Sequence, residues 1–339
     1  MSQRKKLITY VLGGILGLVI ICFLGAWAYY YMPNSKMEHP QQVVLIVDKD
    51  QTGAEIGDML YQKGLIQSPA AFRLALRVTG AVDKLQQGYY QIPQNASLHQ
   101  VIQLLQQGKL KSIRVTIPEG YTINQIAEEL AKDGLSSKEA FLEAAKTYVP
   151  YQYMYGPAPV DYKPEGFLFP STYEIPVDAK PNDILKIMTK EMDSKLTPDI
   201  RKKISDKGLT VFEFITLASL VEKEAKYDVD RPVIAAVFLK RLKIGMPLQS
   251  CASIQYILGY PKPQLSLEDT QLPSPYNTYL HTGLPPGPIA NPGMKSMEAV
   301  LNAGDTEYLY FVADKEGYHH FTKTYEEHLK VVDSIYGND

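Results

Sequence analysis

Residues 7–32 contain no Asp, Glu, Lys, Arg or His, and this uncharged stretch limits what the chain can fold into more than any other feature. A helix needs only about 20 mainly apolar residues to cross the hydrocarbon core of a bilayer. We therefore predict one membrane-spanning helix over residues 7–32. Residues 1–6 are rich in Lys and Arg, and the positive-inside tendency keeps them in the cytoplasm as a short tail. The catalytic or binding part that follows is then expected to be extracytoplasmic, in a single-pass protein of the cell membrane.

Aromatic residues gather at the far end of this stretch, at Trp27 and at Tyr29, Tyr30 and Tyr31. Such rings prefer the headgroup region, which supports the same orientation. The small residues around Trp27 would also suit cleavage of a signal peptide, although the apolar stretch is longer than the usual h-region of ~7 to 15 residues. We expect the helix to be retained as an anchor, and in either case the rest of the chain to be exported.

The charge of the chain excludes some partners. Its 339 residues include 35 Lys plus Arg and 37 Asp plus Glu, a formal net charge of −2, so bulk charge gives no support to nucleic-acid binding. Its only cysteines are Cys22, inside the apolar stretch, and Cys251, so no disulfide framework is expected. At ~100 to 200 residues per domain, the length predicts two domains.

A short strand–helix pattern recurs three times after the apolar stretch. In each copy an apolar strand is followed by a Ser or Thr helix cap, an apolar helix face and a Gly stop. The copies are Val43–Val47 with Thr52 and Gly64, Tyr89–Ile92 with Ser97 and Gly108, and Val115–Ile117 with Thr122 and Gly134. Such small units must share a sheet or pack on a neighbour.

These units resemble LysM glycan-binding modules, although a scaffold without a ligand remains equally open. We place the LysM-like module at residues 33–117, with an end that could extend to about 150. Residues 118–339 are expected to form a larger α+β catalytic domain. In it we predict helices at 181–195, 199–207, 211–226 and 231–243, ordered loops at 151–176 and 261–292, and a hairpin at 308–322 that leads into a helix near Thr324.

The helix at 211–225 is apolar almost all round, which predicts a buried helix. At 100° per residue, Glu222 falls on its apolar stripe, where desolvation would raise the pKa of the carboxyl group and suit a general acid. Glu224 points roughly the opposite way, so the two carboxyl groups are not a pair. The alternative is that Glu222 lies in a solvated last turn and pairs with Lys226.

Several separated motifs match one family together. They are Ala218–Ala225, Arg231, Val237–Leu242, Met246–Ser250, Ser274–Tyr279, Gly283–Ile289, Asn291–Gly293 and His320–His328. With the single anchor and the small module, they resemble the endolytic murein transglycosylases of the YceG-like family. One departure is visible, because Cys251 stands where many members have an Asp.

The resemblance implies that Glu222 is the catalytic acid and base of a peptidoglycan lytic transglycosylase. The reaction implied is cleavage of the β-1,4 bond between N-acetylmuramic acid and N-acetylglucosamine in nascent glycan strands, leaving 1,6-anhydro ends. It further implies association with penicillin-binding synthases and the elongation machinery. We expect no cofactor and no metal, since no metal-binding spacing occurs. We call the predicted loop at 261–292 the Pro-rich loop. The candidate substrate-binding residues on it and close to it in sequence are Gln249, Ser250, Tyr276, Asn277, Thr278 and Asn291.

A single carboxyl group can suffice for this reaction. The C6 hydroxyl of the muramic acid is already tethered to the reacting ring, and well-oriented intramolecular groups reach effective molarities of ~10⁵ M or more. Two alternatives remain open: a hydrolytic muramidase that uses water and a second carboxyl group such as Glu165, and a wall-binding scaffold without catalytic activity.

Overall fold

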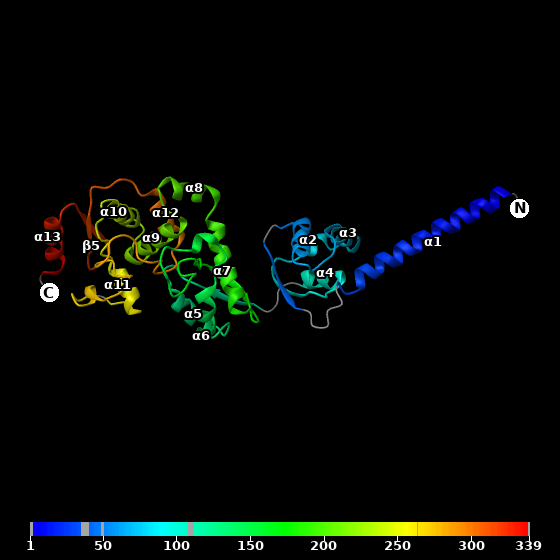
Figure 1. Cartoon of the computed structure of the whole chain (residues 1–339), viewed down its shortest axis with the longest axis horizontal. Helices are drawn as coiled ribbons and strands as arrows, with labels where there is room; N and C mark the ends of the chain where they lie inside the picture. The colour runs from blue at the N-terminus through cyan, green and yellow to red at the C-terminus, as the bar shows by residue number, and fades with distance from the viewer. Residues whose placement is uncertain (1–2, 35–40, 49–50, 108–111, 263, 338–339) are drawn as a thin grey trace. The chain divides into compact units, whose positions relative to one another are not determined.

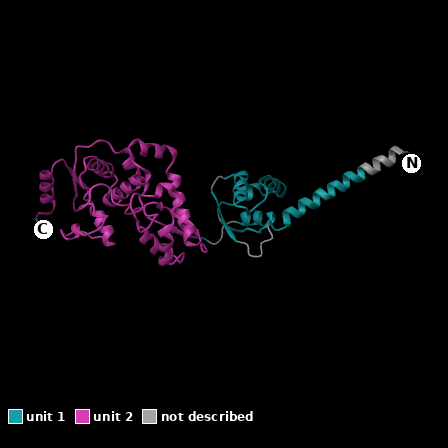
Figure 2. Cartoon of the chain, viewed as in Figure 1, with its two compact units in different colours: residues 1–112 teal, residues 113–339 magenta. Residues whose placement is uncertain are grey.

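The computed structural model describes residues 3–34, 41–48, 51–107, 112–262 and 264–337. They fall into two units, Met1–Ser112 and Ile113–Asp339 (Figure 2). The sequence placed the corresponding boundary between 117 and 118. The strand that was expected to end the small module therefore lies at the start of the second unit.

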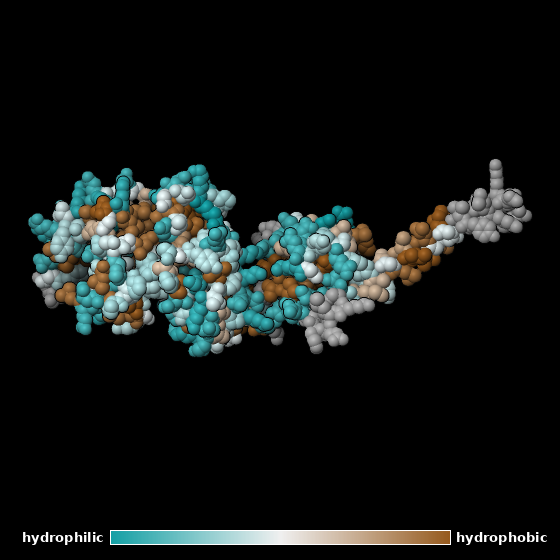
Figure 3. Space-filling model, in the orientation of Figure 1, coloured by the Kyte–Doolittle hydropathy of each residue, from teal (hydrophilic) through white to brown (hydrophobic). Residues whose placement is uncertain are grey.

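An uninterrupted helix, α1 (Gln3–Tyr31), forms over the uncharged stretch (Figure 1). Its segment Leu12–Tyr31 has a mean hydropathy of 2.1, is not buried, and is long enough to cross a membrane. Brown apolar residues cover its visible described surface in Figure 3. This helix is compatible with the predicted membrane anchor. Its end is tied to the rest of the first unit, since the Tyr30 hydroxyl lies 3.1 Å from Nδ1 of His99.

The remainder of the first unit is a small α+β module. Its elements are β1 (Gln42–Val47), α2 (Gly53–Gln62), α3 (Pro69–Thr79), the 3₁₀ turn η1 (Val82–Lys84), β2 (Gly88–Pro93) and α4 (Leu98–Gln107). β1 and β2 pair antiparallel, with Gln42 opposite Pro93 and Val47 opposite Gly88. Apolar side chains of both strands and of the helices α2, α3 and α4 form one core.

The caps predicted for this module are confirmed. Thr52 begins α2 in a capping box with Glu55, and the Ser97 hydroxyl accepts a hydrogen bond from the Gln100 amide at the start of α4. Gly108, the predicted stop of that helix, lies outside the described residues. The helix α3 was not predicted, although Ser68 and Pro69 are a usual helix start.

The third strand–helix copy exists but belongs to another sheet. β3 (Ser112–Thr116) pairs with β4 (Thr172–Pro176), and α5 (Ile123–Lys132) follows with its Thr122 cap. The prediction of a loop over 151–176 is therefore wrong at its end. Tyr173 and Ile175 alternate with exposed residues and fill the core beside β3, which is the strand pattern that the abundance of Pro, Tyr and Gly concealed.

The second unit is mainly helical, with a C-terminal hairpin. Its further elements are α6 (Lys138–Thr147), η2 (Gln152–Met154), α7 (Pro181–Lys195), α8 (Pro198–Asp206), α9 (Val211–Glu224), α10 (Arg231–Lys243), α11 (Cys251–Leu258), η3 (Asp269–Gln271), α12 (Met294–Asn302), β5 (Tyr310–Ala313), β6 (His319–Thr322) and α13 (Tyr325–Tyr336). The four predicted helices from 181 to 243 and the predicted hairpin and final helix are confirmed. α6, α11 and α12 were not predicted.

Helix α9 lies at the centre of this unit (Figure 1). Every residue from Phe212 to Val221 except Glu213 is buried, and α10 and α12 both pack against this part of the core. The predicted buried helix and the α+β class are therefore confirmed. A second cluster, formed by α5, α6, α7 and the pair β3–β4, lies in the same unit. The last turn of α9 is therefore held in place by the helices that pack against it.

Candidate active site

The last turn of α9 holds Glu222 at the edge of the core. The helix starts at Thr210, whose side chain forms a capping box with Glu213, and it ends at Glu224. Only 6% of the Glu222 side chain is exposed. A carboxyl group so withdrawn from water needs hydrogen-bond partners inside the protein.

The Glu222 carboxyl group has three such partners from two other helices. Oε1 accepts a hydrogen bond from Nη1 of Arg231, at 3.3 Å, at the start of α10. Oε2 accepts from the backbone N–H of Gly293, at 3.0 Å, and from the hydroxyl of Ser296, at 2.8 Å, at the start of α12. Nη1 of Arg231 also donates to Ser296 Oγ at 2.6 Å.

These contacts correct two expectations drawn from the helix pattern. The carboxyl group is surrounded by polar donors and not by the apolar stripe, because α10 and α12 converge on the end of α9. The alternative pairing with Lys226 is also wrong. Lys226 Nζ donates to the backbone oxygen of Glu316, at 2.7 Å, and leaves Glu222 to Arg231.

Arg231 is itself held from several sides. Its Nε donates to Asp228 Oδ1 at 3.2 Å, and Lys295 Nζ pairs with the other oxygen of Asp228 at 2.5 Å. The preceding residue, Asp230, accepts a hydrogen bond from the backbone N–H of His319, at 3.0 Å, and its Oδ2 lies 3.0 Å from Nδ1 of the same His. The hairpin β5–β6 therefore helps to fix the start of α10 beside Glu222.

A second carboxyl group, which the sequence reasoning missed, lies close to Glu222. It belongs to Glu119, in the turn between β3 and α5, and it is exposed. A β-carbon built on Gly293 would lie 1.9 Å from Glu119 Oε1, so this carboxyl group packs directly on the glycine that donates to Glu222. The strand–Pro–Glu–Gly–Tyr–Thr order of residues 115–122 was the available signal, since it puts a carboxyl group on a tight turn before a helix cap.

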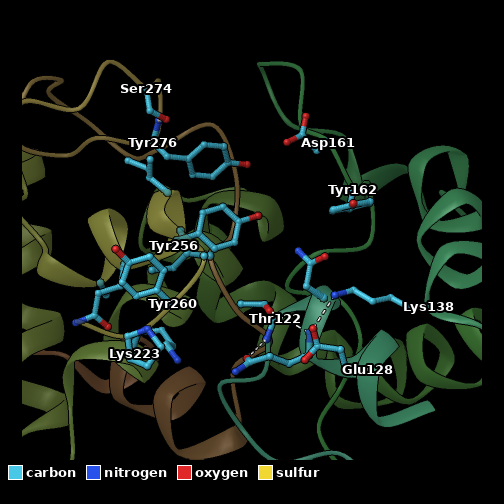
Figure 4. A pocket seen from close by; sticks show the side chains of 18 residues that line it. Thr122, Glu128, Lys138, Asp161, Tyr162, Lys223, Tyr256, Tyr260, Ser274 and Tyr276 are labelled. Carbon is cyan, nitrogen blue, oxygen red and sulfur yellow. Dashed lines mark hydrogen bonds and ion pairs between the residues drawn. The ribbon is translucent and has the colours of Figure 1, made fainter. Parts of the chain in front are cut away.

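A groove of about 600 Å³ opens in this unit between α5 and α11 (Figure 4). Lys223, the residue after Glu222, lines it, whereas Glu222 does not. Tyr256, Tyr260 and Tyr276 lie on one side, and the ion pair between Lys138 and Glu128, at 2.6 Å, on the other. Flat aromatic faces beside charged and hydroxyl groups are a surface that suits sugar rings.

The structure distributes the six predicted substrate-binding residues over two settings. Tyr276 lines the groove, and Gln249 is exposed with φ +48°. The other four are buried and bonded internally: Ser250, Asn277, Thr278 and Asn291. Their internal partners are backbone groups or buried side chains.

Asn291 shows how these buried residues work. Its side chain accepts a hydrogen bond from the Leu168 amide, at 2.8 Å, and donates to the Tyr121 oxygen and to Glu165 Oε1, at 2.9 and 3.2 Å. It thereby connects the Pro-rich loop to two other loops. The substrate-binding role of all six residues stays a prediction, and in this structure the four buried side chains support the fold around the groove.

Glu165, the alternative second carboxyl group, is only 3% exposed. It accepts hydrogen bonds from the Ile123 amide, at 3.1 and 3.2 Å, and from Asn291, and Tyr256 lies 3.5 Å away. Burial raises its pKa to about 8, against the opposing effect of these donors. Glu165 is therefore largely an uncharged carboxylic acid at neutral pH.

Glu224, the last residue of α9, points toward the start of α11. It accepts hydrogen bonds there from the Ser250 hydroxyl and, at 3.2 Å, from the Ala252 amide, so its partners differ from those of Glu222. Cys251 lies beside them with its Sγ 3.1 Å from the hydroxyl of Tyr279. Desolvation and then the charge of Glu224 raise the pKa of this thiol to about 11, which disfavours a nucleophilic thiolate. Among the described residues, no cluster of His, Cys, Asp or Glu side chains is arranged to hold a metal ion.

Comparisons with known proteins identify the family of this chain. The chain is 36% identical to an endolytic murein transglycosylase of Bacillus subtilis, over 81% of this chain and 79% of the relative. It is 32% identical to the protein of the same name from Streptococcus pneumoniae, over 94% of this chain and 64% of the relative. The crystal structure of a yceG-like protein from Listeria monocytogenes matches 86% of this chain and all of its own, at 30% identity and a TM-score of 0.61. The model of the YceG-like family matches residues 45–334, and the chain belongs to that family.

Proposed function

We propose that the chain is an endolytic murein transglycosylase in which Glu222 is the single general acid and base. The names of its relatives support the activity and the peptidoglycan substrate. The observation that supports the residue is the setting of Glu222, a carboxyl group that two helices converge on and hold beside an exposed turn and a groove. Such fixed groups need little rearrangement when charge moves during a reaction.

In the proposed reaction Glu222 first gives up a proton and then regains one from the substrate. Glu222 as the acid donates a proton to the glycosidic oxygen, and the bond between that oxygen and C1 of the muramic acid breaks. The C6 hydroxyl of the same sugar attacks C1 and returns its proton to the Glu222 carboxylate. The products are a 1,6-anhydro-muramic end and a free 4-hydroxyl on the neighbouring glucosamine. Water is not consumed.

The groove is the proposed path for the glycan strand. Its lining includes Lys223, so a strand lying in it would pass the residue next to the acid. Tyr256 and Tyr276 offer ring faces at the end away from the Lys138–Glu128 pair. The exposed Glu119 and the adjoining Gly120 mark the side from which the scissile bond would approach Glu222.

The internal contacts of Glu165 count against the hydrolytic alternative. A second catalytic carboxyl group in a water-using glycosidase must contact either the sugar or the attacking water. Glu165 contacts the Ile123 amide, Asn291 and Tyr256 and is almost closed to solvent. The substrate's own hydroxyl is therefore the better-supported nucleophile.

The experiment that tests this function compares the full-length protein with its Glu222→Gln variant on purified sacculi. Mass analysis of the released muropeptides is expected to show ends lighter by one water than hydrolytic ends. The variant should lose about 10²- to 10⁴-fold in rate, the usual contribution of a general acid–base group. Hydrolytic ends would overturn the reaction type, and undiminished release of anhydro ends by the variant would overturn the role of Glu222.

We also propose a place for the enzyme at the membrane. The apolar helix is retained as a single-pass anchor, residues 1–6 stay in the cytoplasm, and the catalytic domain at 118–339 works outside on nascent strands. The strand–helix–helix–strand order of β1, α2, α3 and β2 supports a LysM-like glycan-binding module within residues 33–117. Association with penicillin-binding synthases and the elongation machinery would follow from the shared substrate.

A further inference from the structure

We propose that Glu119 is a positioning residue of this reaction, whose carboxylate lies beside Glu222 and helps Glu222 to hold the proton that the leaving oxygen requires. This inference rests on the proposed function and adds a second residue to it. Its basis is a contact between the turn that carries Glu119 and the glycine that bonds to Glu222.

Gly293 joins the two carboxyl groups. Its backbone N–H donates to Glu222 Oε2 at 3.0 Å. Its α-carbon faces Glu119, since a β-carbon there would come within 1.9 Å of Oε1 and 2.1 Å of Cδ. Any larger residue at 293 would have to displace the Glu119 side chain. The absence of a side chain at this position is what lets the two carboxyl groups approach.

The turn that carries Glu119 is fixed against the same elements. The amide of Gly120, which has φ +75°, donates to the Asn291 oxygen, and the Asn291 amide donates to the Tyr121 oxygen, both at 2.9 Å. Lys223 Nζ donates to the Gly120 oxygen at 3.3 Å. A β-carbon on Gly120 would lie 3.5 Å from Cγ of Glu222. Glu119 is therefore held next to the acid although its side chain is exposed.

Four charged groups act on Glu119: Glu222, Asp228, Arg231 and Lys295. Desolvation and then the charge of Glu222 raise the pKa of Glu119, Asp228 adds to this, and the two cations oppose it. Electrostatic interaction between two groups is mutual. The negative charge of Glu119 therefore lies where it opposes a second negative charge at Glu222.

The repulsion between the two carboxylates bears on the first step of the proposed reaction. Three donors hold the Glu222 carboxyl group, and one of them is the cationic Arg231. Donors and cations stabilise a carboxylate, whereas the first step requires a carboxylic acid. A neighbouring negative charge works in the opposite direction. Glu119 supplies that charge from the side that is open to the substrate.

The test is the pH dependence of kcat/KM for the full-length protein on purified glycan strands, with Glu119→Gln as the main variant. Removing the negative charge should move the alkaline limb of the profile to lower pH by about half to one unit, since an exposed partner is partly screened. Glu119→Ala should move it equally and provides a second variant that does not depend on amide packing. Glu143→Gln, which removes a charge from the exposed surface of α6, should leave the limb in place.

The outcomes are distinct. An unmoved limb in both variants would overturn the role of Glu119, and so would an equal loss of rate at every pH, which indicates a purely structural contact. If Glu222→Gln is inactive and the Glu119 variants show no shift, only this inference fails. If Glu222→Gln is fully active, the proposed function fails as well.

Discussion

The second unit contains two nearly buried glutamates, and their surroundings differ. Glu222 is bonded to a guanidinium, a hydroxyl and a backbone amide at the end of α9. Glu165 is bonded to neutral donors only, at the start of α5, and its pKa is raised to about 8. Glu222 lies beside the exposed turn that carries Glu119, whereas Glu165 lies behind Tyr256 in the wall of the groove.

The difference teaches that burial alone does not identify a catalytic acid. Burial raises the pKa of Glu165 to about 8, yet its contacts with the Ile123 amide, Asn291 and Tyr256 connect loops of the protein to one another. Glu222 has a charged partner and lies beside the turn that carries the exposed Glu119. A group that must exchange its proton with substrate has to lie within hydrogen-bond reach of it.

The largest effect is expected from breaking the ion pair of Glu222. Arg231→Met keeps an unbranched apolar stem and removes the guanidinium charge, which leaves the buried Glu222 without its cation. Removing one partner of a buried pair costs about 3 to 5 kcal/mol. Calorimetry of the full-length variant should show an unfolding transition lowered by on the order of 10 °C, together with loss of cleavage.

The matched control is Lys243→Met, which makes the same change on the exposed end of α10. It should leave both the unfolding transition and cleavage close to those of the unmodified protein. A transition of Arg231→Met that coincides with that of the control would show that Glu222 does not depend on Arg231.

The sequence predicted the features of this site that depend on nearby residues. It did not predict the contacts between residues that are distant in the chain. The helix α9 and the inward direction of Glu222 are local, and the pattern predicted them, although it did not single out the cap at Thr210. Arg231, Gly293 and Ser296 reach Glu222 only when α10 and α12 pack, so the pattern left the carboxyl group with apolar neighbours. Glu119 lies far earlier in the chain, in a turn without periodicity.

The same reasoning explains the fold. β1 and β2 were predicted from short apolar runs, and the hairpin β5–β6 because its two strands are joined by a turn close in sequence. β4 was missed because its partner β3 lies far away and its surroundings are rich in Pro and Tyr. α3 could have been recognised from Ser68 and Pro69, whereas the pairing of β3 outside the first unit could not.

A second, smaller effect is the pH dependence that Glu165 gives to the free energy of unfolding. The folded-state pKa of Glu165 is raised to about 8 from its ordinary value of 4.5, so above the unfolded pKa the unfolded chain loses its proton while the folded protein keeps it. Stability from this residue is thus full at low pH and is lost as pH rises toward the folded pKa. Glu165→Gln cannot titrate. Between about pH 5 and about pH 8 its stability relative to the unmodified protein should rise by about 2 to 4 kcal/mol, at about 1.4 kcal/mol for each pKa unit.

The measurement is the unfolding transition of both proteins across that pH range, with Glu143→Gln as a control that removes an exposed carboxyl group. A constant difference between Glu165→Gln and the unmodified protein at all pH values would show that Glu165 is charged in the folded state.

The smallest effect concerns the groove wall that covers Glu165. Tyr276 lines the groove with its ring centroid 5.0 Å from that of Tyr256, so Tyr276→Ala removes a face on which a sugar can stack without exposing Glu222. Contacts of this kind contribute about 0.5 to 1.5 kcal/mol, which corresponds to a loss of roughly 2- to 12-fold in kcat/KM. Tyr276→Phe keeps the face and should recover most of the rate, whereas Tyr325→Ala, on the exposed surface of α13, should cost nothing. Equal rates for Tyr276→Ala and Tyr325→Ala would remove the groove from the path of the strand and leave the turn at Glu119 as the approach to the acid.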